Sequence, residues 1–176
     1  IEALKDRVIT VNGVSKGFAM TGWRLGYIGA PAWIAKACSK VQGQVTSAPC
    51  SIAQVAAGAA VTADPSIADD MKKAFLQRRD IMIAGLSALP GLKVNKPMGA
   101  FYLFPDVSAL FGKSVGERQI DNAQDFAMYL LEVANVATVG GGAFGTPVCI
   151  RVSYAASESQ LQEALRRISE AVEALH

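Results

Sequence analysis

Apolar residues recur at helical spacing over several long segments of the chain and in short runs between them. Short apolar runs that end at glycine or asparagine are typical of strands, whereas apolar positions three and four residues apart are typical of helices. Proline near the start of a segment and glycine after its end set the expected bounds. The pattern predicts helices over 31–41, 51–62, 64–89, 123–134 and 157–172, and strands over 8–11, 25–28 (buried), 92–94, 100–104, 136–139 and 149–154.

The helix predicted over 64–89 is long for a small domain, and long helices often join two lobes. Asp64 can cap its start, and Pro90 with Gly91 ends it. The residues after it alternate short strands with helices and indicate an α+β lobe, in which 106–122 is a polar loop. The chain starts with Ile1, and a strand follows almost at once, so we expect a fragment that begins inside a domain.

Composition excludes several classes of protein. Apolar residues make up 51% and charged residues 18% of the 176 residues, which is enough apolar mass for a core. A net charge of +2 without basic clusters argues against nucleic-acid binding, and no apolar run has the length of a membrane span. The three cysteines have neither metal nor disulfide spacing, so we expect a reducing, cytoplasmic setting and no metal. The single histidine is the terminal His176, which excludes a histidine-based triad.

Two glycine-containing segments imitate nucleotide motifs. The segment 140-GGGAFG-145 satisfies G-x-G-x-x-G, but a strand, rather than the helix that a dinucleotide fingerprint opens, is predicted after it. The segment 112-GKS-114 resembles the end of a phosphate-binding loop, but Val107 stands where the first glycine should be. We interpret the first as a glycine-rich turn and the second as an ordinary loop.

One lysine and one arginine stand eight positions apart in the uncharged segment 13-GVSKGFAMTGWRLG-26. A lysine in a turn after a buried strand can be desolvated, which lowers its pKa and frees its amine as a nucleophile for an aldehyde. Arginine is a forked donor that suits phosphate. Together the two side chains fit a phosphorylated aldehyde such as pyridoxal phosphate. From spacing alone, an ordinary turn with two solvated cations remains open.

The order of residue types in this segment resembles the lysine signature of the class I and II aminotransferases, which have the fold type I architecture. The resemblance rests on Ser15-Lys16, Ala19 to Arg24, and Gly26-Tyr27. It implies that Lys16 forms the Schiff base with pyridoxal 5'-phosphate and that Arg24 binds the cofactor phosphate. Some members have a phosphate-binding serine at the place of Gly13, so Ser15 is the candidate for a further phosphate contact.

The resemblance extends to the end of the chain. The segment 42-QGQVTSAPCSIAQ-54 is similar to the loop that reaches a neighbouring subunit's active site, and 97-PMGAFYLFP-105 to the small-domain strand near the substrate. The segment 151-RVSYA-155 is similar to the strand with the arginine that binds the substrate carboxylate, which implies that role for Arg151. An unpaired cation among apolar residues is costly, which agrees with a functional role, although an edge-strand arginine that points to water remains open.

The implied fold class is α/β: residues 1–68 are the end of the large cofactor-binding domain, 69–90 the interdomain helix and 91–176 the small α+β domain. The implied enzyme is a homodimeric transaminase that exchanges the amino group of an amino acid with a 2-oxo acid. Similarity to bacterial aspartate/prephenate aminotransferases implies that the amino acid is aspartate. In that family the aspartate at the pyridine nitrogen, the groups at the ring oxygen and the phosphate loop all precede the lysine. We therefore expect the 176 residues alone to have little or no activity.

Three alternatives stay open. The chain can belong to another enzyme of this fold, such as an aromatic or alanine-type aminotransferase or a lyase. It can be a non-catalytic aminotransferase-like module of a transcription regulator, although the run at 20–23 argues against that. It can also be a structural fragment with an accidental motif, which similarity at four separate places disfavours.

Overall fold

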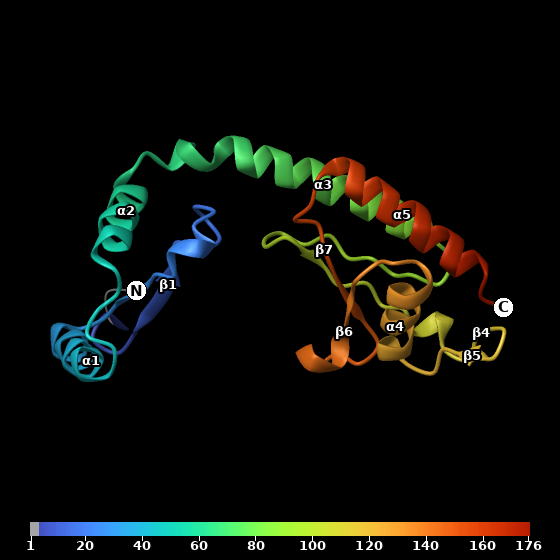
Figure 1. Cartoon of the computed structure of the whole chain (residues 1–176), viewed down its shortest axis with the longest axis horizontal. Helices are drawn as coiled ribbons and strands as arrows, with labels where there is room; N and C mark the ends of the chain where they lie inside the picture. The colour runs from blue at the N-terminus through green and yellow to red at the C-terminus, as the bar shows by residue number, and fades with distance from the viewer. Residues whose placement is uncertain (1–3) are drawn as a thin grey trace. The chain divides into compact units, whose positions relative to one another are not determined.

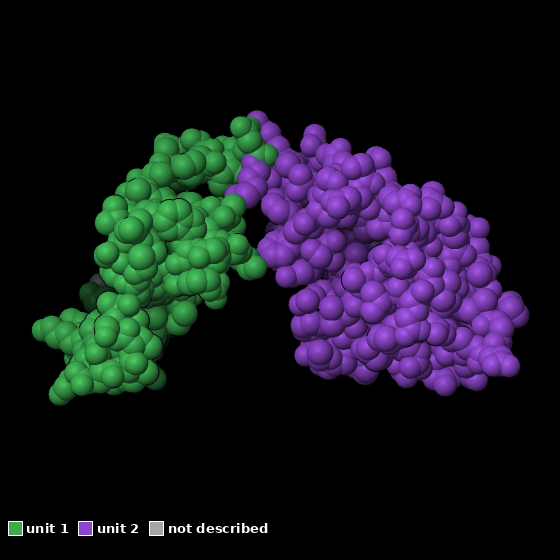
Figure 2. Space-filling model, viewed as in Figure 1, with its two compact units in different colours: residues 1–70 green, residues 71–176 purple. Residues whose placement is uncertain are grey.

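The computed structural model of the chain describes residues 4–176. These residues form two compact units that divide between Asp70 and Met71 (Figure 2). The first unit contains β1 (Thr10–Gly13), η2 (Thr21–Trp23), β2 (Gly26–Gly29), α1 (Ala32–Val45), α2 (Ser51–Thr62) and η3 (Pro65–Ala68). The second contains most of α3 (Asp69–Ser87), then β3 (Tyr102–Leu103), η4 (Ser108–Leu110), β4 (Ser114–Val115), β5 (Arg118–Gln119), α4 (Ala123–Val133), β6 (Val139–Gly140), η5 (Gly141–Phe144), β7 (Ile150–Ser153) and α5 (Glu158–Glu173).

The two strands of the first unit form an antiparallel hairpin, with Thr10 opposite Gly29 and Gly13 opposite Gly26 (Figure 1). The predicted strand over 25–28 is present, one residue later, as β2. The prediction that it is buried is wrong, since β2 is exposed at all four positions. The physical reason is that this sheet has only two strands in the described residues, so its faces lack the neighbours that would cover them.

The two helices of the first unit were predicted within a few residues of their observed bounds, but they bury little. No residue of α1 is buried, and only Ala53 and Ala57 of α2 are. Large apolar side chains such as Trp33 and Val55 are 72% and 75% exposed. Apolar exposure on this scale is typical of a surface that another part of a protein covers.

The predicted long helix begins as expected and has two parts. The Asp64 carboxylate accepts a hydrogen bond of 2.8 Å from the Ser66 backbone N–H, which caps the short helix η3. The α-helix α3 follows directly and ends at Ser87, before the turn at Pro90 and Gly91.

The second unit is built on a three-stranded antiparallel sheet in the order β3–β7–β6. Helices α3 and α5 run side by side (Figure 1), so closely that a Cβ on Gly85 would lie 2.5 Å from a methyl group of Leu165. Helix α5 begins with a complete capping box between Ser157 and Gln160. The core is a single cluster of buried residues that includes Met82, Leu86, Leu103, Phe126, Tyr129, Leu130, Ile150, Val152, Leu161, Ile168 and Val172.

The strands of the second unit are shorter than predicted. The segment 92–94 contributes only an isolated bridge between Lys93 and Asp106, and only Tyr102–Leu103 of 100–104 is a strand. The polar loop over 106–122 contains a hairpin of β4 and β5, which turns at Gly116 with φ of 58°. The bounds of these strands depend on pairing with distant segments of the chain. A local apolar pattern carries no information on that pairing.

Candidate active site

The β1–β2 hairpin holds three of the four candidate residues. Gly13 ends β1 and pairs with Gly26, which begins β2. The segment between the two strands therefore starts and finishes at the same end of the hairpin. Ser15 and Lys16 follow Gly13 by two and three positions, and Arg24 precedes Gly26 by two. The structure therefore brings Ser15, Lys16 and Arg24 to the same end of the hairpin.

The two paired glycines let the strands approach closely at this end. A Cβ on Gly13 would lie 3.3 Å from the Leu25 carbonyl oxygen, and one on Gly26 would lie 3.2 Å from the Asn12 carbonyl oxygen. Both distances are tighter than ordinary van der Waals contact, so a larger residue would push the two strands apart. A serine at the place of Gly13 would therefore change the spacing of the segments that lead to Lys16 and Arg24.

Lys16 lies in a tight turn that is anchored by the fully buried Val14. The Phe18 N–H donates to the Val14 carbonyl at 3.3 Å, and the Ala19 N–H donates to the Lys16 carbonyl at 3.2 Å. Ser15 is half-buried and the Lys16 side chain is exposed. The desolvation of Lys16 suggested by the sequence is therefore not supplied by the residues described, because the sheet beside it is uncovered.

Arg24 directly follows the short helix η2 and has the left-handed conformation, with φ of 51°. That conformation costs a non-glycine residue about 1–2 kcal/mol, so the fold accepts strain to place this side chain. The Nη1 atom donates to the Thr21 carbonyl at 2.9 Å. The side chain borders an open hollow of roughly 510 Å³, which is lined by Gly22, Trp23, Arg24, Cys50, Ile52 and Ala53.

Arg151, the fourth candidate, belongs to the second unit. It lies on β7 opposite Val139 of β6, and its side chain is half-buried. Its Cζ lies 4.6 Å from the ring centroid of Tyr102 and 4.5 Å from that of Phe144. Both contacts fall within the range of cation–π attraction. Across residues 4–176, no carboxylate forms an ion pair with Arg151.

The two aromatic neighbours of Arg151 were not predicted as site residues. Tyr102 lies inside 97-PMGAFYLFP-105, which resembles the family's small-domain strand near the substrate, so that signal was available. Phe144 lies inside the glycine-rich segment, which we interpreted only as a turn. An aromatic residue inside a glycine-rich turn was the overlooked signal.

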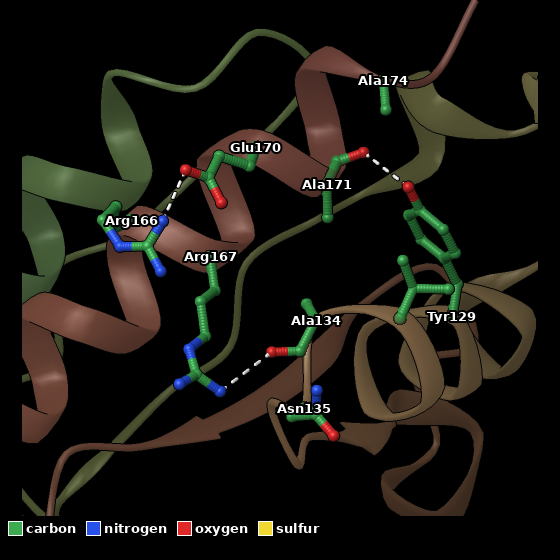
Figure 3. Close-up of a pocket in the computed structure, with 9 residues that line it drawn as sticks. Tyr129, Ala134, Asn135, Arg166, Arg167, Glu170, Ala171 and Ala174 are labelled. Atoms are coloured by element: carbon green, nitrogen blue, oxygen red, sulfur yellow. Dashed lines mark hydrogen bonds and ion pairs between the residues drawn. The ribbon is translucent and has the colours of Figure 1, made fainter.

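A second hollow, of roughly 370 Å³, lies between α4 and α5 (Figure 3). Its polar groups satisfy one another: the Tyr129 hydroxyl donates to the Ala171 carbonyl at 2.9 Å, and Arg167 donates to the Ala134 carbonyl at 3.5 Å. Hydrogen bonds from Arg166 and then Arg167 lower the pKa of Glu163, on the same helix, to about 2. We interpret this region as a structural network.

Residues 4–176 contain no group of three or more histidine, cysteine, aspartate or glutamate side chains that could hold a metal ion. Cys38 and Cys50 are exposed thiols, and burial raises the pKa of the buried Cys149 thiol. None of the helices within these residues has both the length and the apolar character that crossing a membrane requires.

The family model for class I and II aminotransferases matches residues 2–168. The chain belongs to this family. It is 48% identical, over 171 residues, to the bifunctional aspartate aminotransferase and glutamate/aspartate-prephenate aminotransferase of Petunia hybrida, and the match covers 95% of this chain and 36% of that protein.

Two solved aminotransferases have the same fold. The aspartate aminotransferase of Rhizobium meliloti matches with a TM-score of 0.95 and 45% identity, over 100% of this chain and 44% of that one. The aromatic aminotransferase of Pyrococcus horikoshii OT3 matches with a TM-score of 0.85 and 35% identity, over 98% of this chain and 45% of that one. These matches confirm the predicted fold class, that of fold type I transferases, whose class I and II aminotransferases depend on pyridoxal phosphate. The chain spans less than half the length of these relatives.

Proposed function

We propose that this chain is part of a pyridoxal-phosphate-dependent aminotransferase that exchanges the amino group of aspartate with a 2-oxo acid. The observation that carries the proposal is the pairing of Gly13 with Gly26, which brings Lys16 and Arg24 to one end of the hairpin. The chain is 45–48% identical to aspartate aminotransferases and 35% identical to the aromatic aminotransferase of Pyrococcus horikoshii OT3. This difference favours aspartate over an aromatic amino acid as the substrate.

The side chains at the hairpin end fit the cofactor chemically. Lys16 offers a primary amine for the aldehyde, and Arg24 offers guanidinium N–H groups for the phosphate. One of those groups donates to the Thr21 carbonyl, which orients the guanidinium and leaves others to donate. Ser15 offers a hydroxyl one position from Lys16. When bound, pyridoxal phosphate supplies an electron sink for the charge that develops at the substrate Cα.

In the proposed reaction this chain's residues bind the substrate and move its proton. Arg151 binds the substrate α-carboxylate through paired N–H groups, which orients the amino acid. Lys16 Nζ, as a neutral amine, takes the proton from the substrate Cα and later gives a proton back.

The second carboxylate of aspartate needs a cation of its own. Between Lys40 and Lys72 the sequence contains no lysine or arginine, so the segment 42–54 does not supply one. We propose that this cation comes from outside the 176 residues.

We also propose that the enzyme is a homodimer in which segment 42–54 approaches the partner's site. The exposed apolar side chains of α1 and α2, among them Val45 at 74% and Ile52 at 70%, support a covered surface there. The division into a large-domain part (1–68), a connecting helix (69–90) and a small domain (91–176) is part of the same proposal. A cytoplasmic location stays a prediction.

The test joins this chain to the part of the Rhizobium meliloti aspartate aminotransferase that precedes the matched region. The chimera is loaded with pyridoxal phosphate, reduced with borohydride and digested, and its activity on aspartate and 2-oxoglutarate is measured. We expect the reduced adduct on the peptide that contains Lys16, and a loss of about 10²- to 10⁴-fold in kcat for Lys16→Ala. The matched control is Lys36→Ala, an exposed lysine on α1. An adduct on another lysine would refute the assignment of Lys16.

The 176-residue chain is assayed beside the chimera. We expect little or no turnover from the chain alone, because the cofactor-ring contacts of this family precede the lysine. Turnover of aspartate by the purified chain would contradict this part of the proposal.

A further inference from the structure

The register of the second unit's sheet places Arg151 and Tyr102 on one face. Tyr102 pairs with Ser153, which lies two positions from Arg151 and therefore on the same side of β7. Diagonal neighbours across antiparallel strands lie within reach of aromatic and long side chains. Their intervening partners, Leu103 and Val152, are buried on the opposite face. The contact between Arg151 and Tyr102 is thus built into the pairing of β3 with β7.

Phe144 reaches Arg151 from the other side of β7. It ends η5, which directly follows β6, the strand on the opposite flank from β3. The loop that carries it is tight: the Gly141 N–H donates to the Cys149 carbonyl at 2.7 Å, and the Thr146 N–H donates to the Gly141 carbonyl at 3.1 Å. The glycine-rich segment therefore holds an aromatic ring in place against Arg151.

The surroundings of Arg151 differ from those of four other arginines in the unit. Arg79, Arg118, Arg166 and Arg167 each form an ion pair with a carboxylate. Arg151 has two aromatic rings instead, which attract the cation through their faces and contain no carboxylate oxygen to pair with its N–H groups. Its donors therefore remain available to a carboxylate that arrives from solution.

We propose that Tyr102 and Phe144 are positioning residues that hold the Arg151 guanidinium ready to bind a carboxylate. The rings restrict the rotamers of a long side chain, so less conformational freedom is lost when the ligand binds. They also keep the positive charge without an internal counter-ion that the ligand would have to displace. The inference rests on the proposed function in one respect, that Arg151 binds the substrate carboxylate.

The first measurement is the side-chain ¹⁵Nε–¹Hε resonance of Arg151 in the ¹⁵N-labelled 176-residue chain, assigned with Arg151→Lys. Two nearby rings should shift this proton upfield of the protons of the ion-paired arginines. The shift should shrink in Tyr102→Leu and in Phe144→Leu and persist in Tyr102→Phe, which keeps the ring. Phe111→Leu removes a ring that packs elsewhere on the core and should leave the shift unchanged. An Arg151 resonance without a ring-dependent shift would overturn the inference.

The second measurement follows the same resonance during titration with maleate, a dicarboxylate. We expect each leucine variant to bind about two- to fivefold more weakly, the double variant about tenfold more weakly, and Tyr102→Phe and Phe111→Leu like the parent chain. Backbone ¹⁵N spectra show which variants keep the native fold. If Tyr102→Leu does not, Phe144→Leu provides the test, because the Phe144 side chain is 46% exposed.

The two measurements separate the possible failures. Leucine variants that lose the ring-dependent shift but bind maleate like the parent chain would overturn the positioning role and leave Arg151 as the carboxylate ligand. Maleate that shifts other resonances but not that of Arg151 would overturn the assignment of Arg151 and this inference with it, while leaving Lys16 and Arg24 untouched.

Discussion

Replacing Gly141 with alanine tests how firmly the glycine-rich loop is packed. An added Cβ would lie 2.2 Å from the Thr146 carbonyl oxygen and 2.5 Å from that of Cys149. Both obstacles are main-chain atoms, which cannot rotate away as a side chain can. The loop must therefore open, and the 2.7 Å hydrogen bond from Gly141 to Cys149 is weakened.

The expected cost combines two effects. Overpacking a tight site costs about 1–3 kcal/mol, and a lost backbone hydrogen bond about 1 kcal/mol more. We therefore expect Gly141→Ala to lower the free energy of unfolding of the second unit by about 2–4 kcal/mol. Since Phe144 lies in the same loop, the Arg151 Nε–Hε resonance should move as well.

Two neighbouring glycines provide matched controls. The space beside Gly142 is open and its φ is not positive, so Gly142→Ala should cause no loss and can add up to about 1 kcal/mol. Gly145 is also in open space but has φ of 78°, so Gly145→Ala should cost about 1–2 kcal/mol through backbone conformation alone.

The assay is urea unfolding of each variant, followed by far-ultraviolet circular dichroism and by amide signals of the second unit. We expect Gly142→Ala to be the most stable of the three variants, Gly145→Ala to be intermediate and Gly141→Ala to be the least stable. A Gly141→Ala chain that unfolds at the same urea concentration as Gly142→Ala would refute the reasoning, because it would mean that the loop yields at no cost.

Three further predictions concern the helices of the second unit. Ser157→Ala removes the capping box of α5 and should cost about 1 kcal/mol in urea unfolding, whereas Ser157→Gly should cost only a few tenths; equal losses would contradict the capping argument. Tyr129→Phe leaves the Ala171 carbonyl without its donor at 2.9 Å and should cost about 1–2 kcal/mol, and an unchanged unfolding midpoint would oppose this. NMR titration should give Glu163 a pKa of about 2, because Arg166 stabilises its carboxylate. Its ionised form therefore stabilises the fold above the ordinary glutamate pKa of 4.5, and this contribution is lost as the pH falls towards 2. Glu163→Gln should accordingly be less stable than the parent near neutral pH, and the difference should shrink as the pH falls from 4.5 towards 2; a difference that does not change with pH would contradict the assignment.

The helices were predictable from sequence because their signals are local. Proline, a capping serine and apolar residues at helical spacing gave the bounds of α2 and the start of α5 directly. The strands were less predictable, since their ends depend on partners far away in the chain. The turn at Gly116, for example, lies in a segment whose polar composition indicated only a loop.

In the candidate site, too, some residues could be predicted from local sequence and others could not. Similarity of short motifs named Lys16, Arg24 and Arg151, and each could be placed on a strand end or strand before the fold was known. The rings around Arg151 could not be named, because they come from two segments about 40 residues apart that meet only when β3 and β6 both pair with β7. A side chain's function can thus be local in sequence while the groups that position it are not.

Unusual backbone conformations occur in the segments that motif similarity associates with function, and they do so independently of that similarity. Within residues 4–176, the non-glycine residues with positive φ are Ala19, Arg24, Ser47, Ala100 and Asn135. Such residues make up only a few per cent of protein chains, and the fold must stabilise their strain elsewhere. Asn135 follows Ala134, the C-cap of α4, and left-handed asparagine is ordinary at that position. The other four lie in the segments 13–26, 42–54 and 97–105, which the sequence had associated with cofactor, partner and substrate. Strain retained in these segments is expected if they place functional groups, and it would be an unexplained cost if they were ordinary turns.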